Sequence, residues 1–110
     1  MIFGIGTDIL KIERIQAIDS LDKFASKILS NNESKLLEKL NDVKKINYLA
    51  KQFACKEAIA KAIGRGITKD TKLKEIEILR DKNGKPTFNP VGSLKASMDN
   101  LGIAKTHVSL

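Results

Sequence analysis

The sequence predicts a single α+β domain in which a small antiparallel sheet packs against a long central helix. Residues 44–63 form one run of helix-forming residues that is apolar almost all round, as in a helix central to its fold. The expected elements run from a strand through three helices, a hairpin and a helix to a last strand, without regular βαβ alternation. The 110 residues are the length of one domain, so we expect residues 1–110 to form it.

The N-terminal part is expected to hold the first strand and two or three short helices. Residues 1–10 are apolar, β-prone and interrupted by two glycines, which is typical of a buried strand. Residues 11–18 predict a helical turn, and residues 20–30 predict an amphipathic helix. Ser30 and Glu33 have the spacing of a capping box, which opens the next helix.

The C-terminal part is expected to supply the sheet. The long helix ends at Gly64, a typical C-terminal stop. Residues 73–88 predict a β-hairpin, with the tight-turn chemistry of Asn83-Gly84 between two extended runs. A last short helix ends at Gly102, and residues 105–110 begin a strand.

The composition favours an anionic partner. The net charge is +7, from 20 Lys plus Arg against 13 acids, and such a balance suits nucleic acid, a phosphorylated small molecule or an acidic protein. A lysine-rich surface that only aids solubility is an equal alternative. One Tyr, four Phe and no Trp give a poor base-stacking platform for single-stranded nucleic acid.

The same sequence gives no sign of a membrane or of secretion. No segment has the apolar length of a membrane span, and the N-terminus lacks the features of a signal peptide. The single Cys55 has no partner for an intramolecular disulfide. We therefore expect a cytoplasmic protein, and we interpret Cys55 as a packed small hydrophobic residue.

A single carboxylate, Glu57, interrupts the small apolar face of the long helix. Lys61 follows it at the i, i+4 spacing of an ordinary helix ion pair. However, small residues such as Ala50 and Ala60 lie on that face at about 100° per residue, which makes simple exposure doubtful. We interpret these alanines as leaving room for a ligand or a metal ion.

Asp8 is the second unusual acid, because it follows the glycine-rich first segment among apolar residues. A buried Asp must be hydrogen-bonded or matched to a cation; the alternative is that it caps a turn into the first helix. Two carboxylates with space for phosphate oxygens and water suit Mg²⁺. Asp8 and Glu57 are candidate ligands, with Lys61 as a point charge on a phosphate. One His and one Cys make no zinc cluster.

Two further positions are weaker candidates. In the Gly64-Arg65-Gly66 turn, the glycines allow close backbone approach to a ligand and Arg65 offers a fork for phosphate. A plain helix stop with a solvated arginine explains the turn equally well. His107, on the expected last strand, fits a structural hydrogen-bonding role better than a catalytic one.

Taken together, these segments resemble the bacterial holo-[acyl-carrier-protein] synthases, the short 4′-phosphopantetheinyl transferases. The N-terminal signature of that family is similar to GIGTDILKIERI. Its second signature, a Lys-Glu-Ala core followed by a lysine and a Gly-x-Gly-Ile turn, is similar to FACKEAIAKAIGRGI. The hairpin DKNGKP and the final HVSL match in order and spacing, so the resemblance spans essentially the whole chain.

The resemblance implies a 4′-phosphopantetheinyl transferase-like fold that assembles as a homotrimer with active sites between subunits. It implies Mg²⁺-dependent transfer of 4′-phosphopantetheine from coenzyme A to a serine of apo-acyl carrier protein, with 3′,5′-ADP released, in fatty acid biosynthesis. It implies no nucleic-acid or membrane partner.

The residues that match the family's functional positions fall into three groups. The catalytic group is Asp8, Glu57 and Lys61, of which Asp8 and Glu57 match the Mg²⁺ ligands. The coenzyme A group is Lys61, Gly64, Arg65, Gly66 and His107. The group that docks the carrier protein is Arg14, Lys23 and Phe24.

The chain departs from the family pattern in three places. Arg65 stands where a small hydroxyl residue is common, and Cys55 stands where alanine is common. Family members usually continue past HVSL with a Ser-His or Thr-His pair and one more β-strand. We therefore expect a C-terminal strand of the family domain to be missing from residues 1–110.

Two other classes of function stay open from the residues alone. A small basic nucleic-acid-binding module would need its lysines to converge on one face, and would bind oligonucleotides with a steep salt dependence but not coenzyme A. A non-catalytic scaffold would have kept the fold and lost activity. The presence of Asp8, Glu57 and Lys61 argues against the scaffold.

Overall fold

The structure is a computed structural model that describes residues 2–64 and 72–110. Its elements are α1 (Ile12–Gln16), α2 (Leu21–Ile28), α3 (Asn31–Glu38), α4 (Asp42–Ile63), the 3₁₀ helix η1 (Leu73–Glu75), β1 (Ile76–Arg80), β2 (Pro86–Pro90) and α5 (Gly92–Asn100). Helices and one two-stranded antiparallel sheet make up this part of the chain, which confirms the predicted α+β class. Within the described ranges, no helix has the length and apolarity needed to cross a membrane.

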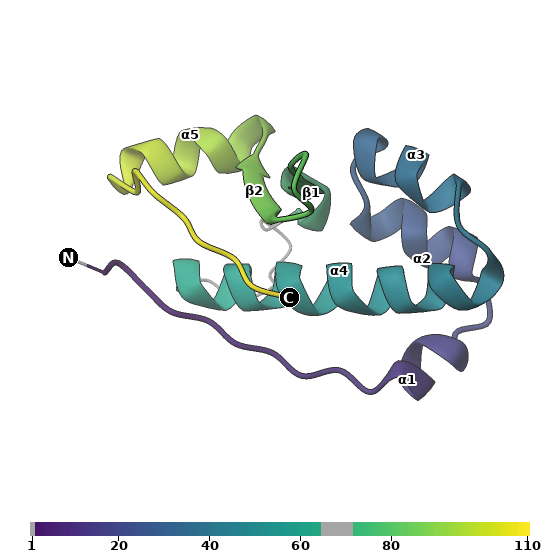
Figure 1. The fold of residues 1–110 in the computed structure, drawn as a ribbon. Coiled ribbons are helices and arrows are strands. Elements are labelled where there is room, and N and C mark those ends of the chain that lie inside the picture. The colour runs from purple at the N-terminus through teal and green to yellow at the C-terminus, as the bar shows by residue number, and fades with distance from the viewer. Residues whose placement is uncertain (1, 65–71) are drawn as a thin grey trace.

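The long helix α4 is the axis of the molecule, as the sequence predicts. Figure 1 shows the N-terminal segment and α1 on one side of α4, and α2, α3, the hairpin and α5 on the other. The side chain of Asn41 caps the start of α4 by accepting a bond from the backbone N–H of Lys44. Gly64 ends the helix in the left-handed conformation, with φ of 92°, which confirms the predicted stop.

Two hydrophobic clusters lie along α4. The first joins α1, α2 and the N-terminal half of α4, and consists of Ile15, Ala25, Ile28, Leu29, Leu49 and Ala50. The second joins the C-terminal half of α4 to β1, and consists of Cys55, Ala60, Ile76 and Ile78. Because α4 contributes to both clusters, it has few free faces, which explains its apolar character all round.

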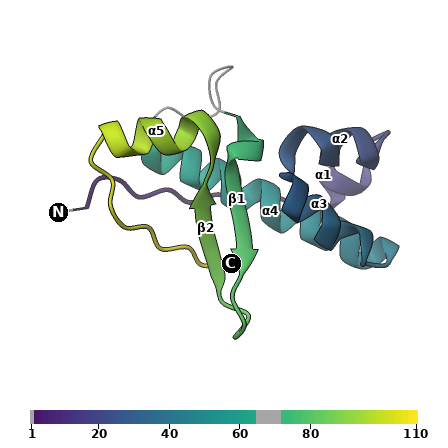
Figure 2. The same cartoon turned by 90° about the horizontal axis from the view of Figure 1, so that it is seen from above.

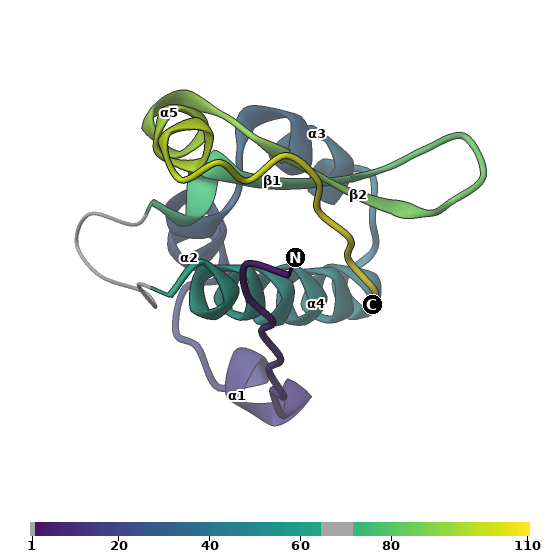
Figure 3. The same ribbon diagram turned by 90° about the vertical axis from the view of Figure 1, so that its left-hand side faces the viewer.

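The hairpin crosses α4, and its tip projects beyond the helix (Figures 2 and 3). Ile78 lies opposite Phe88 in the antiparallel register. The connection between the strands spans residues 81–85, so it is longer than the tight Asn83-Gly84 turn that the sequence predicts. Within it, the carbonyl oxygen of Asp81 accepts a bond from the N–H of Gly84. Of Asn83 and Gly84, only Gly84 takes a positive φ, of 83°.

The predicted first strand is wrong. Residues 2–11 form no strand but run extended along α4 (Figure 1). A Cβ on Gly6 would lie 1.8 Å from the carbonyl oxygen of Ala58, and one on Gly4 would lie 1.9 Å from that of Ala62. The two glycines therefore allow close contact with a helix, whose backbone groups are already paired and offer no ladder to a strand.

The predicted last strand is also wrong, because residues 103–110 have no regular secondary structure. They run from α5 back toward the middle of α4 (Figure 1). In the described part of the chain, only β1 and β2 pair as strands.

Candidate active site

The candidate site lies where the N-terminal segment passes the C-terminal half of α4. The Nζ atom of Lys61 lies 2.9 Å from Oδ1 of Asp8, and these two positions are 53 residues apart in the sequence. The side chain of Asp8 is 13% exposed. Helix α1 begins after Lys11 without a side-chain cap, so Asp8 is not the cap of that helix.

Glu57 completes the cluster from the same helix as Lys61. Burial raises the pKa of Glu57, and the negative charge of Asp8 and a hydrogen bond with Asp8 raise this pKa further. Lys61 and Arg14 act against this increase. Because the charge of Asp8 acts on Glu57, the two carboxyl groups belong to one site, which is built from two segments that are distant in the sequence.

Lys61 belongs to that site rather than to an ordinary helix ion pair. Its ion pair crosses to Asp8, and no pair between Lys61 and Glu57 within 4.0 Å is present. The hydrogen bond and the charge of Asp8 raise the pKa of Lys61. Its side chain is 53% exposed, so the ammonium is available to a ligand.

The donor set fits Mg²⁺ better than zinc. The site contains two carboxyl groups, and Mg²⁺ is commonly held by one or two carboxylates together with substrate phosphates and water. Among residues 2–64 and 72–110, no group of three or more His, Cys, Asp and Glu residues is arranged to hold a metal. The electrostatic conflict between Asp8 and Glu57 is the kind that a divalent cation relieves.

The small residues near Glu57 have a different role from the one predicted. Ala50 is 6% exposed and Ala60 is 1% exposed, because each is packed in one of the two core clusters. The interpretation that the alanines of this face leave room for a ligand is therefore wrong for Ala50 and Ala60, whereas Ala54 lines the cleft next to the site. Other small residues, Ala58 and Ala62, allow the close approach of the N-terminal segment that carries Asp8.

A cleft of about 1030 Å³ lies next to this site, between the N-terminal segment, α4 and the C-terminal segment. Asp8 and the exposed His107 both line it. Cys55 lines it as well; the residue is 7% exposed and burial raises the pKa of its thiol, so the predicted packing role is confirmed. Gly64 lies one turn after Lys61, whereas the predicted sites at Arg65 and Gly66 lie outside the described residues.

The residues predicted to dock a partner protein lie on α1 and α2. Arg14 is exposed, and its charge acts on the pKa of Glu57, so it lies on the side of the site. Lys23 is exposed on α2. Phe24 packs edge-on against Phe53, with ring centroids 5.3 Å apart, so part of its ring belongs to the core.

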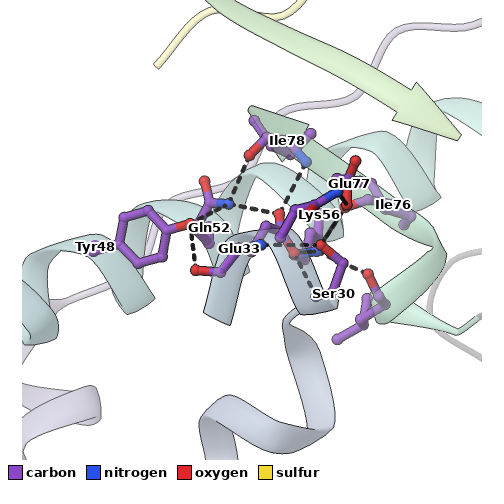
Figure 4. A network of polar contacts seen from close by, with 10 residues as sticks. Ser30, Glu33, Tyr48, Gln52, Lys56, Ile76, Glu77 and Ile78 are labelled. Atoms are coloured by element: carbon purple, nitrogen blue, oxygen red, sulfur yellow. Dashed lines mark hydrogen bonds and ion pairs between the residues drawn. The ribbon is translucent and has the colours of Figure 1, made fainter. Parts of the chain in front are cut away.

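The sequence reasoning missed one polar cluster, which includes the residue before Glu57. Lys56 and Glu33 are each 0% exposed, and their charged atoms lie 2.8 Å apart (Figure 4). The capping-box spacing identified one role of Glu33. Its second role, across 23 residues of sequence, has no local signal.

Comparison with known proteins identifies the family. A family model described as the 4′-phosphopantetheinyl transferase superfamily matches residues 4–107. A holo-[acyl-carrier-protein] synthase of Orientia tsutsugamushi (strain Ikeda) is 38% identical over 112 residues, covering 100% of this chain and 86% of the relative.

Comparison with solved structures points to the same family. The holo-[acyl-carrier-protein] synthase of Neisseria meningitidis aligns with a TM-score of 0.84 at 38% identity, over 96% of this chain and 84% of that one. The Bacillus anthracis synthase in complex with CoA (3′,5′-ADP) aligns with a TM-score of 0.77 at 39% identity, over 84% of this chain and 78% of that one. The chain therefore belongs to the 4′-phosphopantetheinyl transferase superfamily, among the holo-[acyl-carrier-protein] synthases, and is an enzyme of this transferase class.

Proposed function

We propose that the chain transfers the 4′-phosphopantetheine arm of coenzyme A to a serine hydroxyl of an apo-acyl carrier protein, with 3′,5′-ADP as the leaving group. The observation that carries this proposal is the convergence of Asp8, Glu57 and Lys61 from two distant segments. The Neisseria and Orientia relatives are named for synthesis of holo-acyl carrier protein, and the Bacillus relative is in complex with CoA. The family membership favours fatty acid biosynthesis in the cytoplasm as the setting.

The reaction is a displacement at phosphorus. The serine oxygen forms a bond to the phosphorus atom that carries pantetheine, the bond from this phosphorus to the bridging oxygen breaks, and that oxygen leaves with 3′,5′-ADP. The serine proton must be removed as the new bond forms. Glu57 can accept it directly or through a water molecule.

We propose that Asp8 and Glu57 hold Mg²⁺. The ion, when bound, neutralises charge on the pyrophosphate and orients it. Lys61 contributes a separate positive charge from a half-exposed position, suited to the phosphates and to the leaving oxygen. Gly64 and the neighbouring Arg65 and Gly66, together with His107 on the cleft, are the proposed contacts to coenzyme A.

The carrier protein is proposed to dock on α1 and α2. Arg14 and Lys23 are exposed and positively charged, which suits an acidic partner. The net charge of +7 favours the approach of such a partner from a distance. Phe24 adds the exposed part of its ring to this surface.

We also propose a homotrimer with its active sites between subunits. The support is an unusual amount of exposed apolar surface on the N-terminal segment. Ile2, Ile5 and Ile9 are 73%, 77% and 93% exposed. Exposed apolar patches of this kind mark protein contacts, and this segment carries Asp8.

Mass spectrometry tests the proposed activity. An apo-acyl carrier protein is incubated with the chain, coenzyme A and Mg²⁺, and the expected product is a carrier protein that gains one phosphopantetheine group. Asp8→Ala and Glu57→Ala should each abolish this product while circular dichroism stays that of a folded protein, and EDTA should do the same to the wild type. No adduct on a carrier protein that a known synthase modifies would overturn the proposal. Full activity of either alanine variant would overturn the metal assignment.

A further inference from the structure

We propose that Lys56 is a positioning residue for the transfer reaction. Its buried contacts fix the rotation and the axial position of α4, and therefore set where Glu57 and Lys61 stand relative to Asp8. This inference rests on the proposed function, because it assigns a role in that reaction to a residue outside the site. Lys56 itself is fully buried and does not line the cleft.

Every hydrogen of the Lys56 ammonium has a partner, and the partners come from separate elements. Nζ lies 2.8 Å from Oε1 of Glu33 in α3, 2.9 Å from the carbonyl oxygen of Leu73 in η1 and 2.6 Å from that of Ile76 in β1. An ammonium group has three donors, so these bonds use all of them. One side chain of α4 is thus tied to three other elements (Figure 4).

Glu33 is equally saturated. Oε1 accepts bonds from Lys56 and from the backbone N–H of Ser30, and Oε2 accepts bonds from Gln52 and the backbone N–H of Ile78. Gln52 lies one turn before Lys56 on α4 and also donates to the carbonyl oxygen of Ile78, 3.1 Å away. Two consecutive turns of α4 are therefore bonded, through Gln52 and Lys56, to the elements that pack on one face of the helix.

The position of these contacts explains their effect on the site. Lys56 and Glu57 are neighbours on α4, so their side chains project about 100° apart. The face with Lys56 meets α3 and β1, whereas the face with Glu57 meets the segment of Asp8. Asp8 lies on a segment that packs against Ala58 and Ala62 but continues into α1, and Ile15 of α1 is held in the first core cluster together with α2. This second anchor means that the segment does not turn with α4 alone.

A small rotation of α4 would be enough to disturb the site. Side-chain atoms lie about 5 to 6 Å from a helix axis, so a rotation of about 10° moves them by about 1 Å. A misplacement of about 1 Å can lower a catalysed rate by about 100-fold. An apolar pair in place of Lys56 and Glu33 would fill the same space, but it would lack the directional bonds that select one rotation.

The experiment separates positioning from stability with three variants. Lys56→Met removes the three bonds and leaves the carboxylate of Glu33 buried without its cation. The double variant Glu33→Gln/Lys56→Met removes that uncompensated charge as well, but restores no bond to Leu73 or Ile76. Ile28→Ala is the control, since it weakens the first core cluster on α2 without touching this network.

The measurements are Tm, and kcat and KM per folded molecule with a carrier protein, coenzyme A and Mg²⁺. We expect a lower Tm for Lys56→Met and partial recovery of Tm in the double variant. In both we expect kcat to fall by about 10- to 100-fold, with KM for the carrier protein within about twofold, since an error of position acts mainly on the transition state. Ile28→Ala should lower Tm while kcat per folded molecule stays near the wild-type value.

Hydrogen exchange tests whether the contacts of Lys56 hold α4 in place, without relying on catalysis. The amides of residues 57–63 and 73–78 should exchange faster in the double variant than in Ile28→Ala at equal distance below Tm. Unchanged exchange in these segments would overturn the proposal, as would a kcat that recovers together with Tm. If the wild-type chain is inactive but the double variant still shows the faster exchange, the result counts against the transferase function alone and not against the role of Lys56 in holding α4.

Discussion

The ammonium of Lys61 lies 2.9 Å from the carboxylate of Asp8, and this contact connects the N-terminal segment to the last turn of α4. Lys61 is half exposed, so the pair contributes little to folding stability in water. Its importance is electrostatic. Lys61 places one positive charge beside two acids, which keeps Asp8 and Glu57 together and offers a cation to a phosphate.

Lys61→Met is expected to damage transfer far more than folding. The variant keeps most of the aliphatic length but removes the charge that we propose stabilises the leaving oxygen. Loss of one such group typically costs about 100- to 1000-fold in kcat. Single-turnover assays with saturating Mg²⁺ measure this loss, and thermal unfolding should show a Tm close to that of the wild type.

Lys44→Met is the matched control for that experiment, because Lys44 is exposed in the first turn of the same helix. It should leave both kcat and Tm near their wild-type values. Equal losses in the two variants would mean that net charge, rather than the place of Lys61, controls the rate.

Glu57→Gln is expected to raise stability at neutral pH in the absence of added metal. The pKa of Glu57 is raised in the folded protein by burial and by Asp8, so its ionised form lowers the free energy of unfolding. A glutamine keeps the size and can still donate to Asp8. The gain in Tm should be largest above the folded-state pKa, where Glu57 is charged in both states.

The pH dependence of the Tm gain in Glu57→Gln tests whether the pKa of Glu57 is raised in the folded protein. As the pH falls through the raised pKa, the native carboxyl takes up a proton before the unfolded chain does, so the advantage of Glu57→Gln shrinks. It should vanish below about 4.3, the ordinary value for glutamate. Thermal unfolding from pH 8 to pH 3 measures this, with Glu38→Gln on α3 as a control for the loss of an exposed carboxylate. A gain that grows toward acid would contradict the perturbed state of Glu57.

Gly6→Ala is expected to displace the segment that carries Asp8. The new Cβ would lie 1.8 Å from the carbonyl oxygen of Ala58, and this backbone atom cannot move away without distorting α4. The segment must shift by more than 1 Å, which we expect to lower kcat by about 100-fold. Steady-state kinetics and Mg²⁺ titration check this outcome, and Thr7→Ala on the same segment is the control. Normal kinetics in Gly6→Ala would show that the segment adapts without moving Asp8.

Much of the helical part of the fold was predictable because its signals are local. The capping box of Ser30 and Glu33, the left-handed stop at Gly64 and the amphipathic pattern of α2 each involve residues within one or two turns. The hairpin followed from its two extended runs, although its turn is longer than Asn83-Gly84 alone suggested. In all of these cases the residues that determine the structure are neighbours in the sequence.

The terminal segments were mispredicted because their structure depends on distant residues. Gly4 and Gly6 resemble the glycines of a buried strand. In the structure they are needed because a side chain at either position would clash with the backbone of Ala62 or Ala58. The proximity of Asp8 to Glu57 and Lys61 was predictable from two odd acids and from family motifs, and the function of these residues stays a prediction. The ion pair of Lys56 was not predictable, since nothing in the sequence around a lysine indicates that it is buried.

Lys23→Ala is expected to weaken carrier-protein docking and nothing else. Lys23 is exposed on α2, and its charge is proposed to face an acidic partner. KM for the carrier protein should rise several-fold at low salt, and the difference from wild type should shrink as salt screens the charges. KM for coenzyme A should not change. Lys95→Ala on α5 is the control for loss of one exposed charge.

Arg14→Ala should show the same docking defect with an added effect on the site. The charge of Arg14 lowers the pKa of Glu57, so its removal should raise that pKa further. Titration of Glu57 by NMR without added metal distinguishes the two effects, because only Arg14→Ala should shift the ionisation of Glu57 toward higher pH. A change limited to coenzyme A affinity in both variants would show that the docking surface lies elsewhere.

Ile5→Asp is expected to dissociate the proposed trimer. Ile5 is 77% exposed on the segment that carries Asp8, and a charge there would oppose burial against a neighbouring subunit. Analytical ultracentrifugation should give the wild type a mass of three times its 12.1 kDa and the variant a mass near 12.1 kDa. Val43→Asp is the matched control, since Val43 is 70% exposed at the start of α4. Because the active sites are proposed to lie between subunits, transfer by Ile5→Asp should fall with the trimer fraction and recover at high protein concentration. Dissociation by Val43→Asp alone would move the interface to the other end of α4, and a monomeric wild type with full activity would remove the trimer from the mechanism.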